Sequence, residues 1–233
     1  MVCEVRELLT IATLFPDLLG TYGDGGNGVV LAERARRRGE KVRLVTMELG
    51  EELPAAQIYL LGGGEDGPQR LARDMLAKSS FASRVADGAS VLAICAGLQI
   101  LGQSFSVEGN DEFEGLAMVD VRTRRGDTRR VGELYVEVGQ RALVGFENHG
   151  GETTLGHGLA PLGRVRRGWG NDGLVDGYRT GSIWASYAHG PLLALNPWFA
   201  DEILERTLGR ELEPLASVAD RLYFERCATL RPR

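Results

Sequence analysis

The sequence predicts a doubly wound α/β domain with a mostly parallel central sheet. Two observations in the first half of the chain predict it. Short apolar segments recur between glycine-rich turns, and each is followed by a segment with helical periodicity. These segments are apolar along their length rather than alternating, which is typical of parallel strands that helices cover on both faces.

The expected elements follow one another as strand and helix. Strands are predicted at residues 8–15, 41–47, 57–61 and 90–94, and helices at residues 28–38 and 69–77. Short β-like pieces at residues 116–121, 131–138 and 183–187 are expected to add antiparallel or mixed strands to the same sheet. Helices at residues 196–208 and 215–227 end the chain. The predicted organisation is one domain over residues 1–205, with a helical tail, residues 206–233, packed on it.

The composition is that of an ordinary soluble globular protein. The 233 residues are 43% apolar, and 27 basic against 32 acidic residues leave a net charge of -5. This length buries a full core, and the charge excludes a global positive field that would gather nucleic acid. No run approaches the roughly 18 apolar residues of a membrane helix, and residues 1–10 lack the pattern of a signal peptide. We therefore expect a cytoplasmic protein.

The three cysteines, Cys3, Cys95 and Cys227, form no C-x-x-C pair, so neither a disulfide framework nor a zinc site is predicted. Cys95 stands where the apolar strand 90–94 turns directly into a helix. Such a corner exposes the sulfur, the helix N-terminus favours the thiolate, and the N–H of Ala96 would face an oxyanion. Cys95 is therefore a candidate nucleophile, and the alternative is a small, inert, buried side chain.

A thiol nucleophile needs a base, and the chain has three histidines. His189 follows the apolar strand 183–187, so it is expected at the same carboxyl edge of the sheet as Cys95. His149 lies in a predicted turn, where it lines the pocket or holds a loop, and His157 is expected to face water. His189 is therefore the candidate base.

The segment around the nucleophile resembles the C-x-G-x-Q core of class I glutamine amidotransferases, here Cys95-Ala96-Gly97-Leu98-Gln99. The run Gly62-Gly63-Gly64 resembles their glycine-rich oxyanion loop. Further pieces are similar to the CobB/CobQ-like branch, namely Thr21-Tyr22-Gly23-Asp24-Gly25-Gly26-Asn27, Gly145-Phe146-Glu147-Asn148-His149-Gly150-Gly151, Gly170-Asn171-Asp172-Gly173, Tyr187-Ala188-His189-Gly190-Pro191 and Asn196-Pro197. Within that branch the chain most resembles the GatD-type glutaminase subunits of lipid II isoglutaminyl synthase. The resemblance implies a three-layer, flavodoxin-like fold with a mostly parallel central sheet.

The resemblance also implies a reaction, the hydrolysis of L-glutamine to glutamate and ammonia through a thioester on Cys95. His189 would protonate the leaving nitrogen and then activate water. The N–H groups of Ala96, Gly63 and Gly64 would hold the oxyanion. No metal or cofactor is expected in this chain.

Substrate binding is expected to use arginine, the natural fork for a carboxylate. The family carries a glutamine-binding arginine shortly before a hydrophobic-glycine pair, and Arg129 fits that spacing best. Arg130 is the close competitor. Gln99, one helical turn beyond Cys95, either lines the pocket or makes a structural hydrogen bond.

Two departures from the common class I pattern stand near the candidate site. Ala93 replaces a glycine that many members carry two residues before the nucleophile. Pro191 stands two residues after His189, where the common pattern has glutamate, and the CobB/CobQ-like branch is similar in this respect. What orients His189 stays open: it works with Cys95 as a dyad, or a partner chain supplies the carboxylate.

A partner is expected because the chain lacks a phosphate-binding loop: residues 23–28 lack the G-K-[ST] ending and residues 62–67 lack G-x-G-x-x-G spacing. The resemblance implies a heterodimer with a MurT-like Mur-ligase subunit. That subunit would hold ATP and Mg, activate D-glutamate of lipid II in peptidoglycan biosynthesis, and receive the ammonia. The alternatives are an amidotransferase for another acceptor such as cobyrinate, a non-catalytic binding subunit, and a thiol hydrolase or redox-sensing relative.

Overall fold

The computed structural model describes residues 7–106, 111–215 and 217–232, so Cys3 lies outside the described residues. Its central feature is a sheet of the order β11-β12-β4-β3-β1-β2. All neighbouring pairs in it are parallel except β11 with β12. The strands are β1 (Leu9–Leu14), β2 (Val42–Met47), β3 (Ile58–Leu61), β4 (Ser90–Ile94), β11 (Tyr178–Thr180) and β12 (Ile183–Ser186). The predicted α/β class is confirmed.

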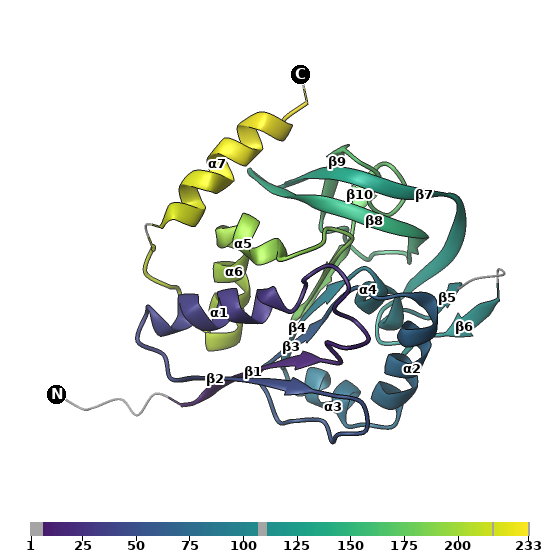
Figure 1. Cartoon of the computed structure of the whole chain (residues 1–233), viewed down its shortest axis with the longest axis horizontal. Helices are drawn as coiled ribbons and strands as arrows, with labels where there is room; N and C mark the ends of the chain where they lie inside the picture. Colours follow the sequence, from purple (N-terminus) through teal and green to yellow (C-terminus); the bar gives the residue numbers. More distant parts are fainter. Residues whose placement is uncertain (1–6, 107–110, 216, 233) are drawn as a thin grey trace.

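Helices cover both faces of this sheet (Figure 1). One face carries α1 (Gly26–Arg36), α5 (Leu192–Leu195) and α6 (Pro197–Leu208). The other carries α2 (Asp66–Ala77), α3 (Phe81–Ala86) and α4 (Ala96–Ile100). Every residue of β1, β3, β4 and β12 is buried, which explains why these segments are apolar rather than alternating.

A second sheet stands beside the first, and its existence corrects one expectation. Its order is β10-β9-β7-β5-β6, with β8 paired to β7. The strands are β5 (Ser104–Ser106), β6 (Glu112–Glu114), β7 (Val121–Val138), β8 (Arg141–Leu155), β9 (Gly163–Arg167) and β10 (Val175–Asp176). The prediction that segments 116–121 and 131–138 join the central sheet is wrong. Much of β7 is exposed, so it fits a hairpin with water on one side better than a doubly covered sheet.

The end of the chain forms α7 (Val218–Leu230), which starts and ends three residues later than the predicted helix. Ser217 and Asp220 form a capping box at its start. Tyr223 donates a hydrogen bond to the carbonyl of Ala142 in β8, and Leu230 packs in a small cluster with residues of β7 and β8. Among the helices of the described residues, none has the length and apolar character needed to cross a bilayer.

Four loops meet at one edge of the central sheet. Strands β1, β3, β4 and β12 run parallel, so the loops that follow them leave at the same, carboxyl edge. Strand β8 also reaches this edge, because the carbonyl of Phe146 accepts a 2.8 Å hydrogen bond from the N–H of His189. In sheets of this type, ligands bind at such an edge.

Candidate active site

The nucleophile candidate, Cys95, lies in the sharp turn between β4 and α4. Its φ of 50° and ψ of -103° are unusual for a residue with a side chain, and such strain gathers at functional sites. The turn is held by the N–H of Cys95, which donates to the carbonyl of Ser186 at 2.9 Å. Gly97 lets α4 approach β3, because a Cβ at this position would overlap Leu61. The predicted nucleophile elbow is therefore present.

His189 is held by a buried acid that the sequence reasoning missed. Its Nδ1 lies 3.1 Å from Oδ2 of Asp24, in the loop between β1 and α1. The same Oδ2 accepts the N–H of Gly63 at 2.8 Å, and Oδ1 accepts the N–H of Gly190 at 2.9 Å. Asp24 is only 3% exposed. One carboxylate thus joins three of the loops at the edge of the sheet.

The environment of His189 favours its protonated form. Burial opposes the charge, but the hydrogen bond with Asp24 and the charge interactions with Asp24 and Cys95 outweigh it and raise the pKa of His189 to about 9. Its Nε2 is buried and has no hydrogen-bond partner among the described residues. The two side chains predicted to act together therefore do interact.

The glycine-rich loop after β3 differs in one detail from the predicted oxyanion hole. Gly63 has no room for a side chain, because a Cβ would overlap the ring of His189. Its N–H already donates to Asp24. Gly64 lies on the pocket wall together with Cys95. Ala96 begins α4, so its N–H has no acceptor within the helix. Of the three predicted donors, Gly63 is thus occupied in this structure, whereas Gly64 and Ala96 remain candidates.

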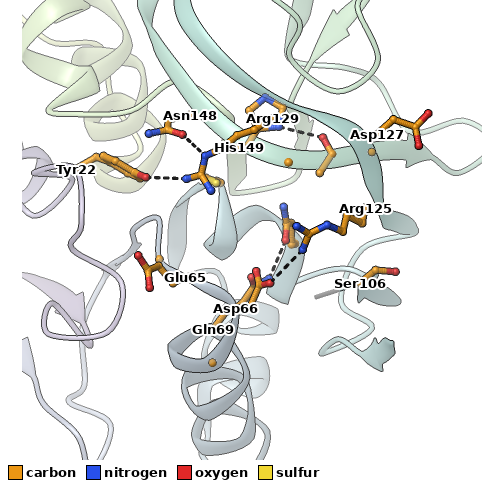
Figure 2. Close-up of a pocket in the computed structure, with 17 residues that line it drawn as sticks. Tyr22, Glu65, Asp66, Gln69, Ser106, Arg125, Asp127, Arg129, Asn148 and His149 are labelled. Carbon is orange, nitrogen blue, oxygen red and sulfur yellow. Dashed lines mark hydrogen bonds and ion pairs between the residues drawn. The ribbon is translucent and has the colours of Figure 1, made fainter. Parts of the chain in front are cut away.

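A polar pocket of about 420 Å³ opens beside Cys95. Arg129 lies in it (Figure 2), where its Nε donates to Oδ1 of Asn148 at 2.6 Å and a terminal nitrogen donates to the Tyr22 hydroxyl at 3.1 Å. Acidic side chains share the pocket, and one of them, Asp66, lies 3.7 Å from Arg125. The pocket therefore offers partners for both a carboxylate and an ammonium group.

The neighbouring Arg130 points elsewhere. Its guanidinium stacks on Trp169 at 3.6 Å and lies 3.8 Å from a carboxylate oxygen of Glu152, outside the pocket. The β7 and β8 register explains the difference: it shifts between Arg125 and Arg130, so the segment 126–129 bulges out of the ladder toward the pocket. Of the two predicted arginines, the structure places only Arg129 in the pocket that Cys95 lines.

Gln99 fulfils both of its predicted roles. It lines the pocket, and its side chain is fixed by accepting a 2.9 Å hydrogen bond from Gln69 and donating one of 3.2 Å to the Tyr187 hydroxyl. His149 also lines the pocket, stacked on Tyr187 with ring centroids 3.8 Å apart. His157 is exposed, as predicted.

Comparison with known proteins decides the family. Residues 10–197 match the family model of the CobB/CobQ-like glutamine amidotransferase domain. The chain belongs to this family. Its relatives include subunit GatD of the glutamine-hydrolyzing lipid II isoglutaminyl synthase from Staphylococcus aureus (strain N315), which is 34% identical over 87% of this chain and 86% of that protein. The same subunit from Streptococcus pneumoniae (strain ATCC BAA-255 / R6) is 32% identical over 87% of this chain and 82% of that protein. The predicted family is thus confirmed.

Solved structures agree on the fold of this CobB/CobQ-like glutamine amidotransferase. A crystal structure of a glutamine amidotransferase matches with a TM-score of 0.58 and 20% identity, over 84% of this chain and 98% of that one. Another, from Thermotoga maritima, matches with a TM-score of 0.53 and 14% identity, over 97% and 96% of the two chains. These identities are low, so the likeness supports the shared architecture alone.

The amidotransferase site contains residues to which sequence reasoning gave no role. Asp24, Tyr22 and Asn148 all lie in motifs that carry the family resemblance, yet no spacing rule connects them to His189 or Arg129. One usable signal existed for Asp24: it follows β1, whose carboxyl end reaches the same edge as Cys95. In the described part of the chain, no group of three or more histidine, cysteine or acidic side chains is arranged to hold a metal ion.

Proposed function

We propose that this chain is a glutaminase subunit that hydrolyses L-glutamine to glutamate and ammonia through a thioester on Cys95. The observation that carries the proposal is the meeting of three features at one pocket. Cys95 lies in a strained elbow, His189 interacts with it and carries a raised pKa, and Arg129 lies on the pocket wall. Glutamine hydrolysis by a cysteine enzyme requires a nucleophile, a base and a cation that binds the substrate carboxylate, and these three residues can supply them.

The first half of the reaction forms the thioester. The Cys95 thiolate attacks the side-chain amide carbon of glutamine, and the electron pair of the C=O bond moves onto oxygen. The N–H of Ala96, at the start of α4, and the N–H of Gly64, on the pocket wall, would hold this oxyanion. As the C–N bond breaks, the imidazolium of His189 gives its proton to the leaving nitrogen, and ammonia departs.

The second half restores the Cys95 thiolate and the imidazolium of His189. Neutral His189 takes a proton from water, and the resulting hydroxide adds to the thioester carbonyl. Glutamate leaves when the C–S bond breaks and the sulfur recovers its electron pair. Each proton that His189 gives or takes passes through Nε2, because Nδ1 is hydrogen-bonded to Asp24.

Arg129 is the proposed partner of the glutamine α-carboxylate. Asn148 and Tyr22 hold its Nε and one terminal nitrogen, so the guanidinium is fixed before the substrate arrives. The acidic side chains of Glu65 and Asp127, which line the same pocket, offer acceptors for the α-ammonium group. No metal enters the proposed reaction, and ATP with Mg is proposed to bind the partner subunit.

The proposed ammonia acceptor is D-glutamate of lipid II, activated by a MurT-like Mur-ligase subunit in a heterodimer. Similarity to the GatD subunits supports this acceptor over cobyrinate. The chain covers 86% and 82% of the two GatD relatives, which are named as subunits. It covers only 32% of the cobyric acid synthase from Pelotomaculum thermopropionicum, at 32% identity over 64% of this chain. This chain therefore matches the GatD subunits over more of its residues, 87%, than it matches that cobyric acid synthase, 64%.

The test is glutamate release from L-glutamine by the purified chain, alone and with the Mur-ligase-like protein encoded nearest to it. Wild type is compared with Cys95→Ala and His189→Ala, and with Cys227→Ala as the matched control, because that thiol lies in α7. We expect activity in wild type and the control only, and amidated lipid II when ligase and ATP are added. Amidation of another acceptor would replace the lipid II proposal, and no activity in any combination would leave a binding subunit.

A further inference from the structure

Strand β2 forms one side of the central sheet (Figure 1). Among the described residues it pairs with β1 alone, along the whole length of the strand. Its side chains are exposed or half-buried except that of Met47, whereas every residue of β1 is buried. An uncovered edge strand presents unpaired N–H and C=O groups, and these are a template for pairing with another strand.

The hydrogen bonds between β1 and β2 show which backbone groups of β2 remain unpaired. The carbonyls of Lys41 and Met47 accept N–H groups at the two ends of β1, at 2.9 and 2.7 Å. Backbone direction alternates along a strand, so Val42, Leu44 and Thr46 point their N–H and C=O groups away from the sheet. Those of Leu44 and Thr46 have no hydrogen-bond partner among the described residues.

We propose that β2 is a self-association edge, on which a second copy of this chain pairs antiparallel about a two-fold axis at Leu44. Side chains alternate between the two faces along a strand, so such an axis must bring one residue opposite its own copy. Leu44 is the centre of the outward groups, and in this register Val42 lies opposite Thr46. The carbonyl of Val42 also accepts from Arg36 at 3.2 Å, which leaves it a second lone pair. All the outward groups are then paired, and the two central sheets become one.

Charges at the two ends of β2 favour a second copy over an unrelated strand. Lys41 and Arg43 lie at its start, and Glu48 and Glu52 follow its end. All four side chains are exposed, and none has an ion-pair partner among the described residues. Antiparallel pairing brings the basic end of each strand beside the acidic end of the other, so the attraction occurs twice in one dimer. Parallel pairing would bring like charges together.

The centre of the edge is apolar. Leu44 points toward α1, because a Cβ at Gly28 would lie 3.0 Å from its side chain, yet Leu44 is 37% exposed. A two-fold axis perpendicular to the sheet keeps the α1 helices of both copies on the same face. Each Leu44 therefore lies opposite the Leu44 of the other copy, and both lose their exposed apolar surface. An apolar centre between charged ends is the usual anatomy of a protein interface.

The dimer would leave the candidate active site open. None of the described residues that line the pocket beside Cys95 belongs to β2. Each copy could therefore still bind the proposed ligase subunit, which gives an assembly of two glutaminase and two ligase chains. The interface uses the same patch on both copies, so it closes as a dimer and does not extend into a fibre. The association goes beyond the glutaminase function and does not require an active Cys95.

The test is the mass of the purified full chain, measured by sedimentation velocity over a range of protein concentrations. Thr46→Pro removes an outward N–H and keeps the hydrogen bonds to β1, because proline is tolerated on the open side of an edge strand. We expect this variant to raise the Kd of the dimer about tenfold or more, since two hydrogen bonds are lost at the symmetric interface. Its melting temperature is measured in parallel and should stay close to that of the wild type.

Charge reversal supplies a rescue that structural damage cannot imitate. We expect Lys41→Glu combined with Arg43→Glu to raise Kd about tenfold at low salt, and Glu48→Lys combined with Glu52→Lys to do the same. The variant with all four substitutions should return to a Kd near that of the wild type, because each basic end again meets an acidic end. Arg164→Glu, at an exposed position of β9, is the control and should leave Kd unchanged.

Several results would overturn the proposal. A wild-type chain that stays monomeric at about 100 μM and low salt lacks this interface. A dimer whose Kd changes with neither Thr46→Pro nor the charge reversals forms through another surface. If the chain is monomeric and the same variants instead weaken binding of the ligase, β2 is a docking strand for the ligase.

Two further measurements keep the test decisive. If Thr46→Pro does not fold, the charge reversals and their rescue decide alone. Glutamate release should be the same in all folded variants, because the pocket lies away from β2. A wild-type chain that is inactive with the ligase contradicts the glutaminase proposal, whereas a wild-type monomer contradicts the dimer.

Discussion

Two buried histidines in this molecule are each paired with a carboxylate, yet their surroundings give them different roles. His189 lies 3.1 Å from Asp24, and His149 lies 3.3 Å from Glu147. Both rings are at most 3% exposed. In His149 both nitrogens have partners, since Nδ1 contacts the carbonyl of Gly151 at 3.0 Å. In His189 only Nδ1 is engaged, and Nε2 has no partner among the residues that the structure describes.

The comparison teaches that a carboxylate partner does not by itself mark a catalytic histidine. What distinguishes His189 is a ring nitrogen that remains available beside a nucleophile. Glu147 instead collects the N–H groups of Trp169 and Gly170, at 2.7 and 2.8 Å, besides His149. The second pair therefore fixes β8 and the following loop, and with them Asn148, which holds Arg129.

The largest loss of activity should come from replacing His189, whose Nε2 has no hydrogen-bond partner among the described residues. We expect His189→Gln to lower kcat/KM for glutamine about 10⁴-fold or more, as loss of a base does in enzymes with an acyl-enzyme intermediate. The matched variant His149→Gln should retain kcat within about tenfold, because its ring gives no proton to substrate. Steady-state glutamate release measures both. An equal loss of kcat/KM in His189→Gln and His149→Gln would show that the two histidines do not differ in catalytic role.

The next largest effect concerns Arg129, which Asn148 holds beside the His149–Glu147 pair. We expect Arg129→Lys to raise KM for glutamine about 10–100-fold, because a lysine cannot keep the contacts with Asn148 and Tyr22 and also form a two-pronged contact with a carboxylate. Arg130→Lys is the control, since its guanidinium stacks on Trp169 outside the pocket. A larger rise in KM for Arg130→Lys would reverse the assignment of the two residues.

The five parallel strands of the central sheet and the positions of Cys95 and His189 at its edge could be predicted because each depends on local sequence, whereas the short antiparallel strand β11 was not predicted. An uncharged run followed by a helical pattern specifies a buried parallel strand, and parallel strands bring their carboxyl ends together. The second sheet was missed because β7 is long, rich in arginine and half exposed, so its pattern does not show which sheet it joins. The choice between Arg129 and Arg130 depended on a register shift that no composition rule reveals.

Asp24 could not be singled out because its role depends on residues far along the chain. Asp17 and Asp24 lie in the same loop after β1, and although only Asp24 belongs to a motif that carries the family resemblance, that motif does not show which residue it contacts. One is exposed, and the other becomes buried because it meets His189, 165 residues later. Glu147 and His149, by contrast, are two positions apart in one strand, and their pairing is a local consequence of β8.

A third prediction tests whether the His149–Glu147 pair stabilises the fold. In His149→Ala, Glu147 loses a buried hydrogen-bond partner but keeps the N–H groups of Trp169 and Gly170. We expect a loss of about 1–3 kcal/mol in the free energy of unfolding, measured by urea denaturation, together with a severalfold rise in KM. His157→Ala, at an exposed position, should leave both unchanged. An unaltered stability in His149→Ala would show that the pair does not hold this region.

The smallest expected effect is a dependence of the melting temperature on pH that arises from the His189–Asp24 pair. The pKa of His189 is raised in the folded chain to about 9, above its ordinary value of 6.5, so the folded state binds the proton more tightly than the unfolded state. The stabilisation is therefore fully present below pH 6.5 and is lost as pH rises toward 9. We expect Tm to fall over this range by a few degrees more in wild type than in Asp24→Asn. Scanning calorimetry at pH 6 and pH 9 measures the difference, and parallel curves for the two proteins would mean that Asp24 does not hold the proton on His189.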